Sequence, residues 1–181
     1  MKFYTKIISL LLLVVITAAC KNTEKNTTNP STSNAVNHDV NYTSKMTKAD
    51  KKKFYDANNN VVYEIKYKPD GFKLRTASSK LLWKIKLYDA KIKISDNEEN
   101  LNPYEIKLVN DNTAKLVKND TKLARLTYTA SSNTQTITST NGLEPKEIKG
   151  NYAPSLLINM ISEISEDQKK IIINELVLKG F

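Results

Sequence analysis

The sequence predicts a mainly β fold with C-terminal helices (an α+β protein), in which an antiparallel meander of about ten strands forms a barrel or roll. These strands are expected to lie around or against a hydrophobic C-terminal helical segment. Three observations predict this fold: a pattern that recurs about every twenty residues from position 53, apolar–polar alternation within each copy, and helical spacing after Pro154. A fixed repeat period indicates that one supersecondary unit recurs along the chain.

Each copy of the repeat has a lysine, an apolar residue, a polar turn, two aliphatic residues, an aromatic residue and a closing Ile-Lys. The clearest copies are Lys53–Lys66 and Lys73–Lys86, and more divergent copies follow at 93–107, 115–126 and 136–149. Alternation at period two is typical of a strand that places one face on a core and the other in water. The links are rich in Asn and Gly, which tolerate the backbone of tight hairpin turns. We therefore expect consecutive hairpins with no helices between them.

The segment from Pro154 changes to helical spacing. Apolar residues over 156–164 fall on one stripe, which predicts a first helix. Ser165 and Gln168 match a capping box, so a second helix is expected to begin there. That helix is apolar over much of its circumference and needs cover on more than one side. The β-branched run Ile171–Ile173 leaves a final strand open as an alternative.

The N-terminus has the pattern of an export signal. A start containing Lys2 and Lys6 precedes an apolar stretch over 7–16, and Thr17-Ala18-Ala19 places small residues before Cys20, the only cysteine. The apolar stretch is shorter than the roughly 20 residues of a membrane-spanning helix and fits a cleaved signal. An ordinary secretory signal, cleaved without modification of the cysteine, is one interpretation of this pattern.

This segment resembles the signal of bacterial lipoproteins, in which the cysteine of the lipobox is diacylated and becomes the new N-terminus. The resemblance implies lipidation at Cys20 and a location in the bacterial cell envelope, held on a membrane by a diacylglycerol anchor without spanning it. Lys21 follows the cysteine where inner-membrane retention would require an aspartate. We therefore expect the outer membrane, with the chain facing the periplasm or the cell surface.

Three regions are predicted. Residues 1–19 form the signal peptide, residues 20–48 form a lipid-anchored tether, and residues 49–181 form the β-rich domain with its C-terminal helices. The tether is dominated by Asn, Thr, Ser and Lys and lacks periodic apolar residues, so it is expected to be disordered.

The strand–turn–strand units Tyr55–Tyr63 and Ala77–Trp83, followed by a strongly apolar C-terminal helix, resemble the tubby C-terminal-like fold. That superfamily includes the LURP-one-related and scramblase-like proteins, in which a β-barrel of hairpins encloses a hydrophobic helix. The resemblance covers roughly residues 52–181. It implies a lipid association by analogy of fold alone and transfers no individual binding residue.

The composition limits the chemistry. The formal net charge is +9, which favours either attraction to anionic surfaces or plain solubility, and nucleic acid is not expected outside the cytoplasm. The only histidine, His38, lies in the tether, so His-dependent catalysis and the usual zinc sites are not expected. The cluster Asp96–Glu99 suits a solvated hairpin tip better than a calcium loop, because it lacks the glycine and the ligand spacing. We expect no enzyme activity, no metal and no cofactor.

Some aromatic residues occupy core-type positions, namely Trp83, Tyr63, Tyr67 and Tyr104. Others, including Tyr128, are candidates for exposure, and together with nearby lysines they could form a basic, aromatic contact surface, although a merely solvated face is the alternative. The residues predicted for this surface are Tyr55, Lys66, Lys84, Lys86, Tyr88 and Lys107.

Three functions follow from these observations. The first is a non-enzymatic, membrane-anchored binding or scaffold module with an anionic lipid or a protein as its partner. The second is an immunity-type lipoprotein that inhibits a periplasmic toxin. The third is an enzyme built on two converging carboxylates. If the helix fills the barrel, binding must use the outer face.

Overall fold

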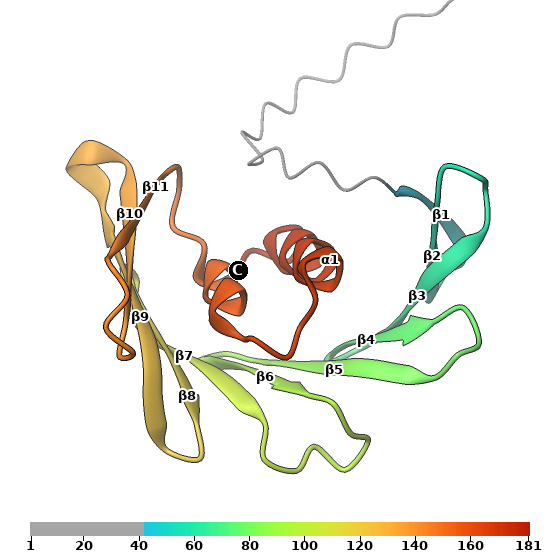
Figure 1. Cartoon of the computed structure of the whole chain (residues 1–181), viewed down its shortest axis with the longest axis horizontal. Helices are drawn as coiled ribbons and strands as arrows, with labels where there is room; N and C mark the ends of the chain where they lie inside the picture. Colours follow the sequence, from blue (N-terminus) through green and yellow to red (C-terminus); the bar gives the residue numbers. More distant parts are fainter. Residues whose placement is uncertain (1–41) are drawn as a thin grey trace, which may run out of the picture. The chain divides into compact units, whose positions relative to one another are not determined.

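The computed structural model describes residues 42–181, so the expected signal, Cys20 and most of the expected tether lie outside the described residues. Eleven strands form one antiparallel sheet in which every strand pairs with its neighbours in sequence (Figure 1). Two helical segments follow the sheet. The strands are β1 (Thr43–Lys48), β2 (Lys51–Tyr55), β3 (Val61–Lys68), β4 (Gly71–Thr76), β5 (Leu81–Tyr88), β6 (Lys91–Ser95), β7 (Tyr104–Asn110), β8 (Thr113–Lys118), β9 (Thr121–Thr129), β10 (Thr134–Ser139) and β11 (Lys146–Lys149). The helical elements are the 3₁₀ turn η1 (Ala130–Ser132), the 3₁₀ helix η2 (Pro154–Met160) and the α-helix α1 (Glu166–Val177).

The sheet curls around η2 and α1, which lie on its concave side (Figure 1). It does not close, because β1 and β11 are the two outer strands and do not pair with each other. The mainly β meander is therefore confirmed, and of the two forms expected the chain adopts the roll. Because the helical segments already cover the apolar face of the sheet, closure of the strands is not needed to bury it.

The strand β1 lies in the segment that we expected to be tether. Residues Thr43–Lys48 pair antiparallel with β2, although all six side chains are exposed. A strand without a buried face has no apolar alternation, so its sequence is indistinguishable from polar linker. It is the strand that brings the number to eleven instead of about ten.

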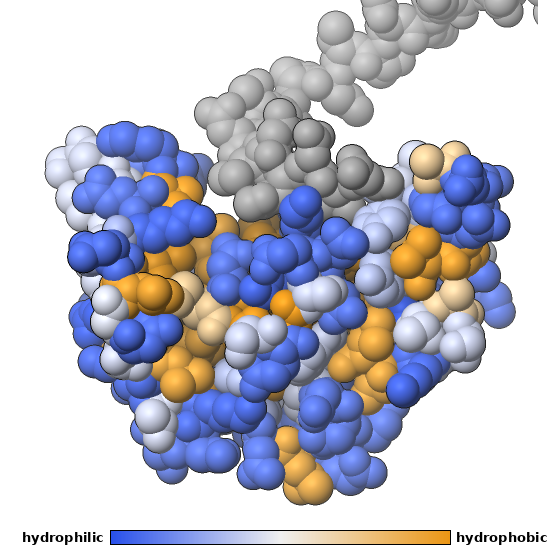
Figure 2. All heavy atoms as spheres, in the orientation of Figure 1, coloured by the Kyte–Doolittle hydropathy of each residue, from blue (hydrophilic) through white to orange (hydrophobic). Residues whose placement is uncertain are grey.

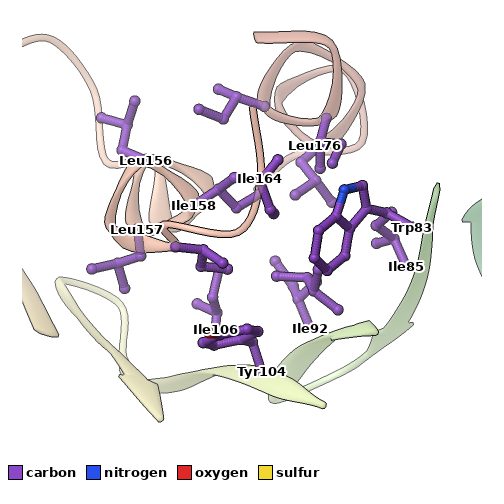
Figure 3. Close-up of a cluster of buried hydrophobic side chains, with 14 of the residues drawn as sticks. Trp83, Ile85, Ile92, Tyr104, Ile106, Leu156, Leu157, Ile158, Ile164 and Leu176 are labelled. Carbon is purple, nitrogen blue, oxygen red and sulfur yellow. The ribbon is translucent and has the colours of Figure 1, made fainter. Parts of the chain in front are cut away.

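The core lies between the concave face and the helical segments. Ile65, Leu74 and Trp83 are aligned across β3, β4 and β5, and all three are buried. Figure 3 shows side chains from the sheet pointing toward those of η2 and α1, with Leu157 and Leu176 among the latter. The predicted core positions of Trp83 and Tyr104 are confirmed, while Tyr63 and Tyr67 are half-buried against the same core.

The C-terminal segments differ in detail from the expected pair of α-helices. The first, η2, is a 3₁₀ helix in which five consecutive residues, 154–158, are buried, so it has no polar stripe. The second, α1, contains Ile171–Ile173 and removes the strand alternative. Ser165 is its N-cap residue, but its side chain makes no capping hydrogen bond. Instead of completing a capping box, Gln168 accepts a hydrogen bond from Trp83 Nε1 at 2.7 Å.

Polar side chains tie the helical segments to the sheet. Glu175 on α1 is buried and accepts hydrogen bonds from Lys52 Nζ at 2.6 Å and from Tyr67 Oη at 2.7 Å. Glu163, between η2 and α1, accepts hydrogen bonds from Tyr104 Oη and from Lys118 Nζ. These bonds orient the helices within the roll. Glu175 depends on its partners most, because a buried carboxylate is stable only where they are in place, whereas Glu163 is exposed.

Candidate binding surface

The convex face of the sheet is the large surface that the fold leaves open to a partner. The concave face packs on η2 and α1 in one hydrophobic cluster. In Figure 2, hydrophilic residues dominate the outer rim of the roll, which is the edge view of the convex face. As alternation requires, lysines that alternate with core residues along a strand, such as Lys66, Lys84 and Lys107, lie on this side.

A first row of lysines crosses the convex face from β1 to β5. The strand register places Lys48 opposite Lys51, Lys51 opposite Lys66, Lys66 opposite Lys73, and Lys73 opposite Lys84. Five consecutive strands thus each contribute one lysine, and at about 4.8 Å between strands the row is about 19 Å long. Like charges directly opposite each other destabilise a sheet. Ion pairs offset part of this cost, because Lys51 lies 2.9 Å from the buried carboxylate of Glu64 and Lys73 pairs with Glu98.

A second row continues from β5 to β9. Tyr88 lies opposite Lys91, Lys91 opposite Lys107, Lys107 opposite Lys115, and Lys115 opposite Arg125. Lys84, Lys86 and Tyr88 alternate along β5 on the same face, so this strand joins the two rows. We call the two rows together with Lys86 and Lys93, which pair across β5 and β6, the basic band; its members are Lys48, Lys51, Lys66, Lys73, Lys84, Lys86, Tyr88, Lys91, Lys93, Lys107, Lys115 and Arg125.

Carboxylates neutralise only part of the basic band. Glu105 on β7 lies within 3.2–3.3 Å of the ammonium groups of Lys91, Lys93 and Lys107. Burial by itself would raise the pKa of Glu105, but the hydrogen bonds from these three lysines outweigh it and hold the pKa below its usual value. One carboxylate therefore serves three cations, and an excess of positive charge remains.

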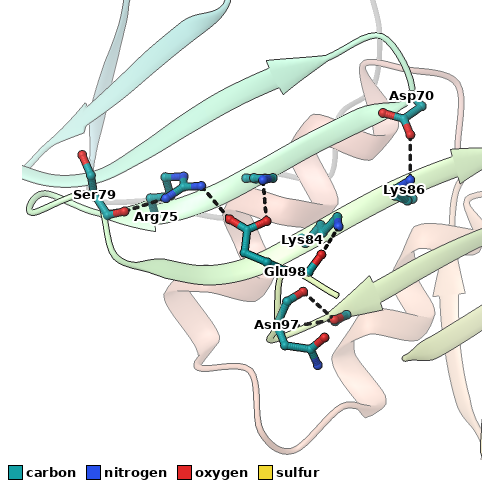
Figure 4. A network of polar contacts seen from close by, with 9 residues as sticks. Asp70, Arg75, Ser79, Lys84, Lys86, Asn97 and Glu98 are labelled. Carbon is teal, nitrogen blue, oxygen red and sulfur yellow. Dashed lines mark hydrogen bonds and ion pairs between the residues drawn. The ribbon is translucent and has the colours of Figure 1, made fainter. Parts of the chain in front are cut away.

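The acidic cluster of the β6–β7 loop folds back onto the band. Glu98 binds Lys73 and Arg75, and its main-chain oxygen accepts a hydrogen bond from Lys84 (Figure 4). The hydrogen bond from Lys73 lowers the pKa of Glu98. The loop is a hairpin tip, as expected, and across residues 42–181 no group of three or more acidic, His or Cys side chains is arranged to hold a metal ion.

Two lysines of the band have cations on both sides and no acid. Lys66 lies between Lys51 and Lys73, and Lys115 lies between Lys107 and Arg125. Within the described part of the chain, neither forms an ion pair. Their ammonium groups are therefore available to an anionic partner.

A shallow, open depression of about 630 Å³ lies at the second row. Its lining includes Tyr88, Lys91, Lys107 and Lys115, together with aliphatic surface from Val109. The ammonium group of Lys91 lies 5.7 Å from the centre of the Tyr88 ring. Three lysines and a single acid, Asp89, line the depression, so it is positively charged overall. Its volume falls within the range of roughly 300–1,000 Å³ typical of small-ligand sites.

The structure brings together five of the six predicted surface residues. Lys66, Lys84, Lys86, Tyr88 and Lys107 all lie in the basic band. Tyr55 does not, because it is half-buried at the end of β2, on the far side of a bulge opposite β3. The sequence analysis did not single out Lys91, Lys115 and Arg125. Their positions on the polar face of the repeats could have identified these three residues as part of the surface.

A second, narrow cleft lies where β6 and β8 end and β7 begins. It has a volume of about 50 Å³ and is lined by Asp96, Glu163, Tyr104 and Lys118. The hydrogen bond from Tyr104 lowers the pKa of Glu163 to about 2, with smaller contributions from Ser162 and Lys118. Glu163 is thus an ionised acceptor that holds the η2–α1 connection, and the space suits ordered water better than a substrate.

Comparison with known protein families, with curated proteins and with solved structures finds no match to this chain. The resemblances drawn from the lipobox and from the repeated hairpins therefore remain predictions. Among residues 42–181, no helix is both long and apolar enough to cross a membrane.

Proposed function

We propose that this chain is a non-enzymatic binding module of the bacterial envelope, held on a membrane through lipid at Cys20, and that its basic band contacts an anionic component of the envelope. The observation that carries the proposal is that lysines lie directly opposite one another on consecutive strands. Like charges directly opposite each other destabilise a sheet, and the carboxylates of Glu64 and Glu98 offset only part of that cost. An anionic partner would turn the same arrangement into a favourable one.

The position of the helices supports the use of the outer face. Because η2 and α1 fill the concave side, a ligand carried inside the roll would have to displace core residues such as Leu157 and Ile172, both fully buried. The convex face offers binding without that cost, and its charge favours encounter with anions over long distances.

The anchor is tested by fractionation. Mass spectrometry of the membrane form should find a lipid-modified N-terminus at Cys20, and the Cys20→Ser variant should move to the soluble fraction. If the variant stayed fully on the membrane, the anchor would be wrong, whereas the binding surface would be unaffected.

The binding surface is tested with the purified full-length protein in neutral detergent. We expect it to bind at least one anionic probe, either vesicles rich in phosphatidylglycerol or a soluble polyanion, and to release it as salt is raised. Neutral vesicles and dextran serve as controls. Absence of binding to every anionic probe at low salt would overturn the proposal and would favour a partner-specific inhibitor of the immunity type.

A further inference from the structure

We infer that the partner of the basic band is an acidic polysaccharide, a flexible linear chain that follows the curve of the sheet and places a sugar ring on Tyr88. This inference rests on the proposed function and specifies the chemical class of the ligand. It follows from the direction of the band, from the curvature of the sheet and from the aromatic content of the surface.

The band runs around the curve of the sheet. Its two rows cross the strands in turn from β1 to β9, so at about 4.8 Å per strand it extends about 38 Å along the arc. Figure 1 shows that the sheet bends strongly along this direction. A flat bilayer would touch such a convex surface only along a narrow strip and would leave most of the lysines without a partner. A flexible polymer can bend with the sheet and meet every strand.

The spacing of the cations also suits a chain with regularly repeated charges. Lys48, Lys51 and Lys66 lie on successive strands, and Lys107, Lys115 and Arg125 do the same in the second row. A strand-by-strand ladder presents one charge at each step, which matches a ligand that carries one anion per repeat unit better than a single multivalent ion. Binding should therefore increase with the length of the polymer.

The aromatic content distinguishes a sugar chain from single-stranded nucleic acid. Proteins that bind single strands without sequence preference stack successive bases on several aromatic side chains. Within the described residues, Tyr88 is the most exposed aromatic residue, with 41% of its surface accessible. A single ring beside Lys91 and Val109, in a depression open to solvent, suits the apolar face of one sugar whose acidic group meets Lys107 or Lys115.

The test measures affinity of the full-length protein for defined probes at low salt. The probes are polygalacturonate, its trimer, long-chain polyphosphate, single-stranded oligothymidylate and phosphatidylglycerol vesicles. We expect polygalacturonate to bind at least tenfold more tightly than its trimer. We also expect it to bind more tightly than the oligonucleotide and, per unit of charge, more tightly than the vesicles.

Two variants locate the binding. Lys66→Gln combined with Lys115→Gln removes two cations without breaking an ion pair and should weaken polygalacturonate binding about five- to tenfold. The matched control combines Lys80→Gln and Lys146→Gln, which removes the same charge from an exposed turn and from the outer strand β11, outside the band. It should change affinity less than twofold.

Tyr88→Ala distinguishes the contribution of sugar stacking to affinity from that of charge. It should weaken binding of polygalacturonate about tenfold and leave polyphosphate, which has no ring to stack, almost unchanged. Because Tyr88 is exposed, this substitution should not affect folding, and a circular dichroism melt verifies that.

The inference and the proposed function fail in different ways. If vesicles bind and polygalacturonate does not, or if trimer and polymer bind equally, the polysaccharide is wrong while a basic binding module remains. Equal loss in the Lys80→Gln/Lys146→Gln control would also overturn the inference, because it would reflect net charge alone. Preference for the oligonucleotide would assign the band to nucleic acid. Only failure of every anionic probe overturns both.

Discussion

Single residues fix the geometry that the repeats require. Gly71 opens β4 with a φ of +151°, and a Cβ atom placed there would lie 2.0 Å from the main-chain oxygen of Ile85 on β5. The side chain must therefore be absent for β4 and β5 to pair. We expect Gly71→Ala to lower the free energy of unfolding by about 3 kcal/mol. Urea unfolding at neutral pH measures this.

The control for that substitution is Gly142→Ala. Gly142 also has a positive φ, +80°, but no atom lies within 4 Å of the position that a Cβ would take. The cost should be limited to the backbone term of about 1 kcal/mol. Equal effects of the two substitutions would contradict the steric role of Gly71.

Glu163 is one of the carboxylates that contribute to the loss of stability in acid, together with others of lowered pKa such as Glu98 and Glu105. Its pKa falls to about 2 in the folded protein, mainly through the hydrogen bond from Tyr104, against an ordinary value of 4.5. A lowered pKa means that the contribution is fully present above pH 4.5 and is lost as the pH falls toward 2. Glu163→Gln should therefore flatten the decline of the melting temperature across this window. An unchanged decline would show that other carboxylates dominate it.

At the scale of elements, α1 acts as part of the core and not as an appendage. Leu176 is fully buried against the sheet, whereas Leu178, one residue beyond α1, is 75% exposed. Leu176→Ala should cost about 3 kcal/mol, in the range of large-to-small core substitutions. Leu178→Ala should change stability by less than about 0.5 kcal/mol.

Urea unfolding followed by both fluorescence and circular dichroism should give one coincident transition, because helix and sheet share a single core.

Elements with a buried face were predictable from the sequence, and elements without one were not. The strands from β2 to β9 follow the alternation of the repeats, since burial of one face imposes period two. In contrast, all six residues of β1 are exposed and the strand is held mainly by main-chain pairing with β2, which leaves no apolar alternation in its sequence. The 3₁₀ geometry of η2 was missed because burial of every residue from 154 to 158 removes the stripe that distinguishes one helix type from another.

The candidate surface was predictable in kind but not in extent. Lysines on the polar face of each repeat were evident, and Lys84, Lys86 and Lys107 were named from them. Which lysine faces which depends on the strand register, and that register shifts at irregularities such as the one between Leu108 and Asn110. Because the shifts arise from hairpin geometry in three dimensions, the continuity from Lys107 to Lys115 and Arg125 could not be read from spacing.

For the whole molecule, the basic band should oppose folding stability in the absence of a partner. Lys66 and Lys115 each face cations on both neighbouring strands, and neither has an acid partner among residues 42–181. Replacing both by Gln should therefore leave the free energy of unfolding unchanged or raise it by about 0.5–1 kcal/mol at low ionic strength. At about 1 M salt the Debye length falls to about 3 Å, and the difference from the original chain should vanish. Urea unfolding at the two salt concentrations measures both values.

A variant that is less stable at low salt would mean that these lysines support the fold through contacts of their aliphatic stems. It would remove the main reason to assign them to a ligand. A variant that is equally or more stable and yet binds polyanions less well would separate the two roles, because it loses binding without losing structure.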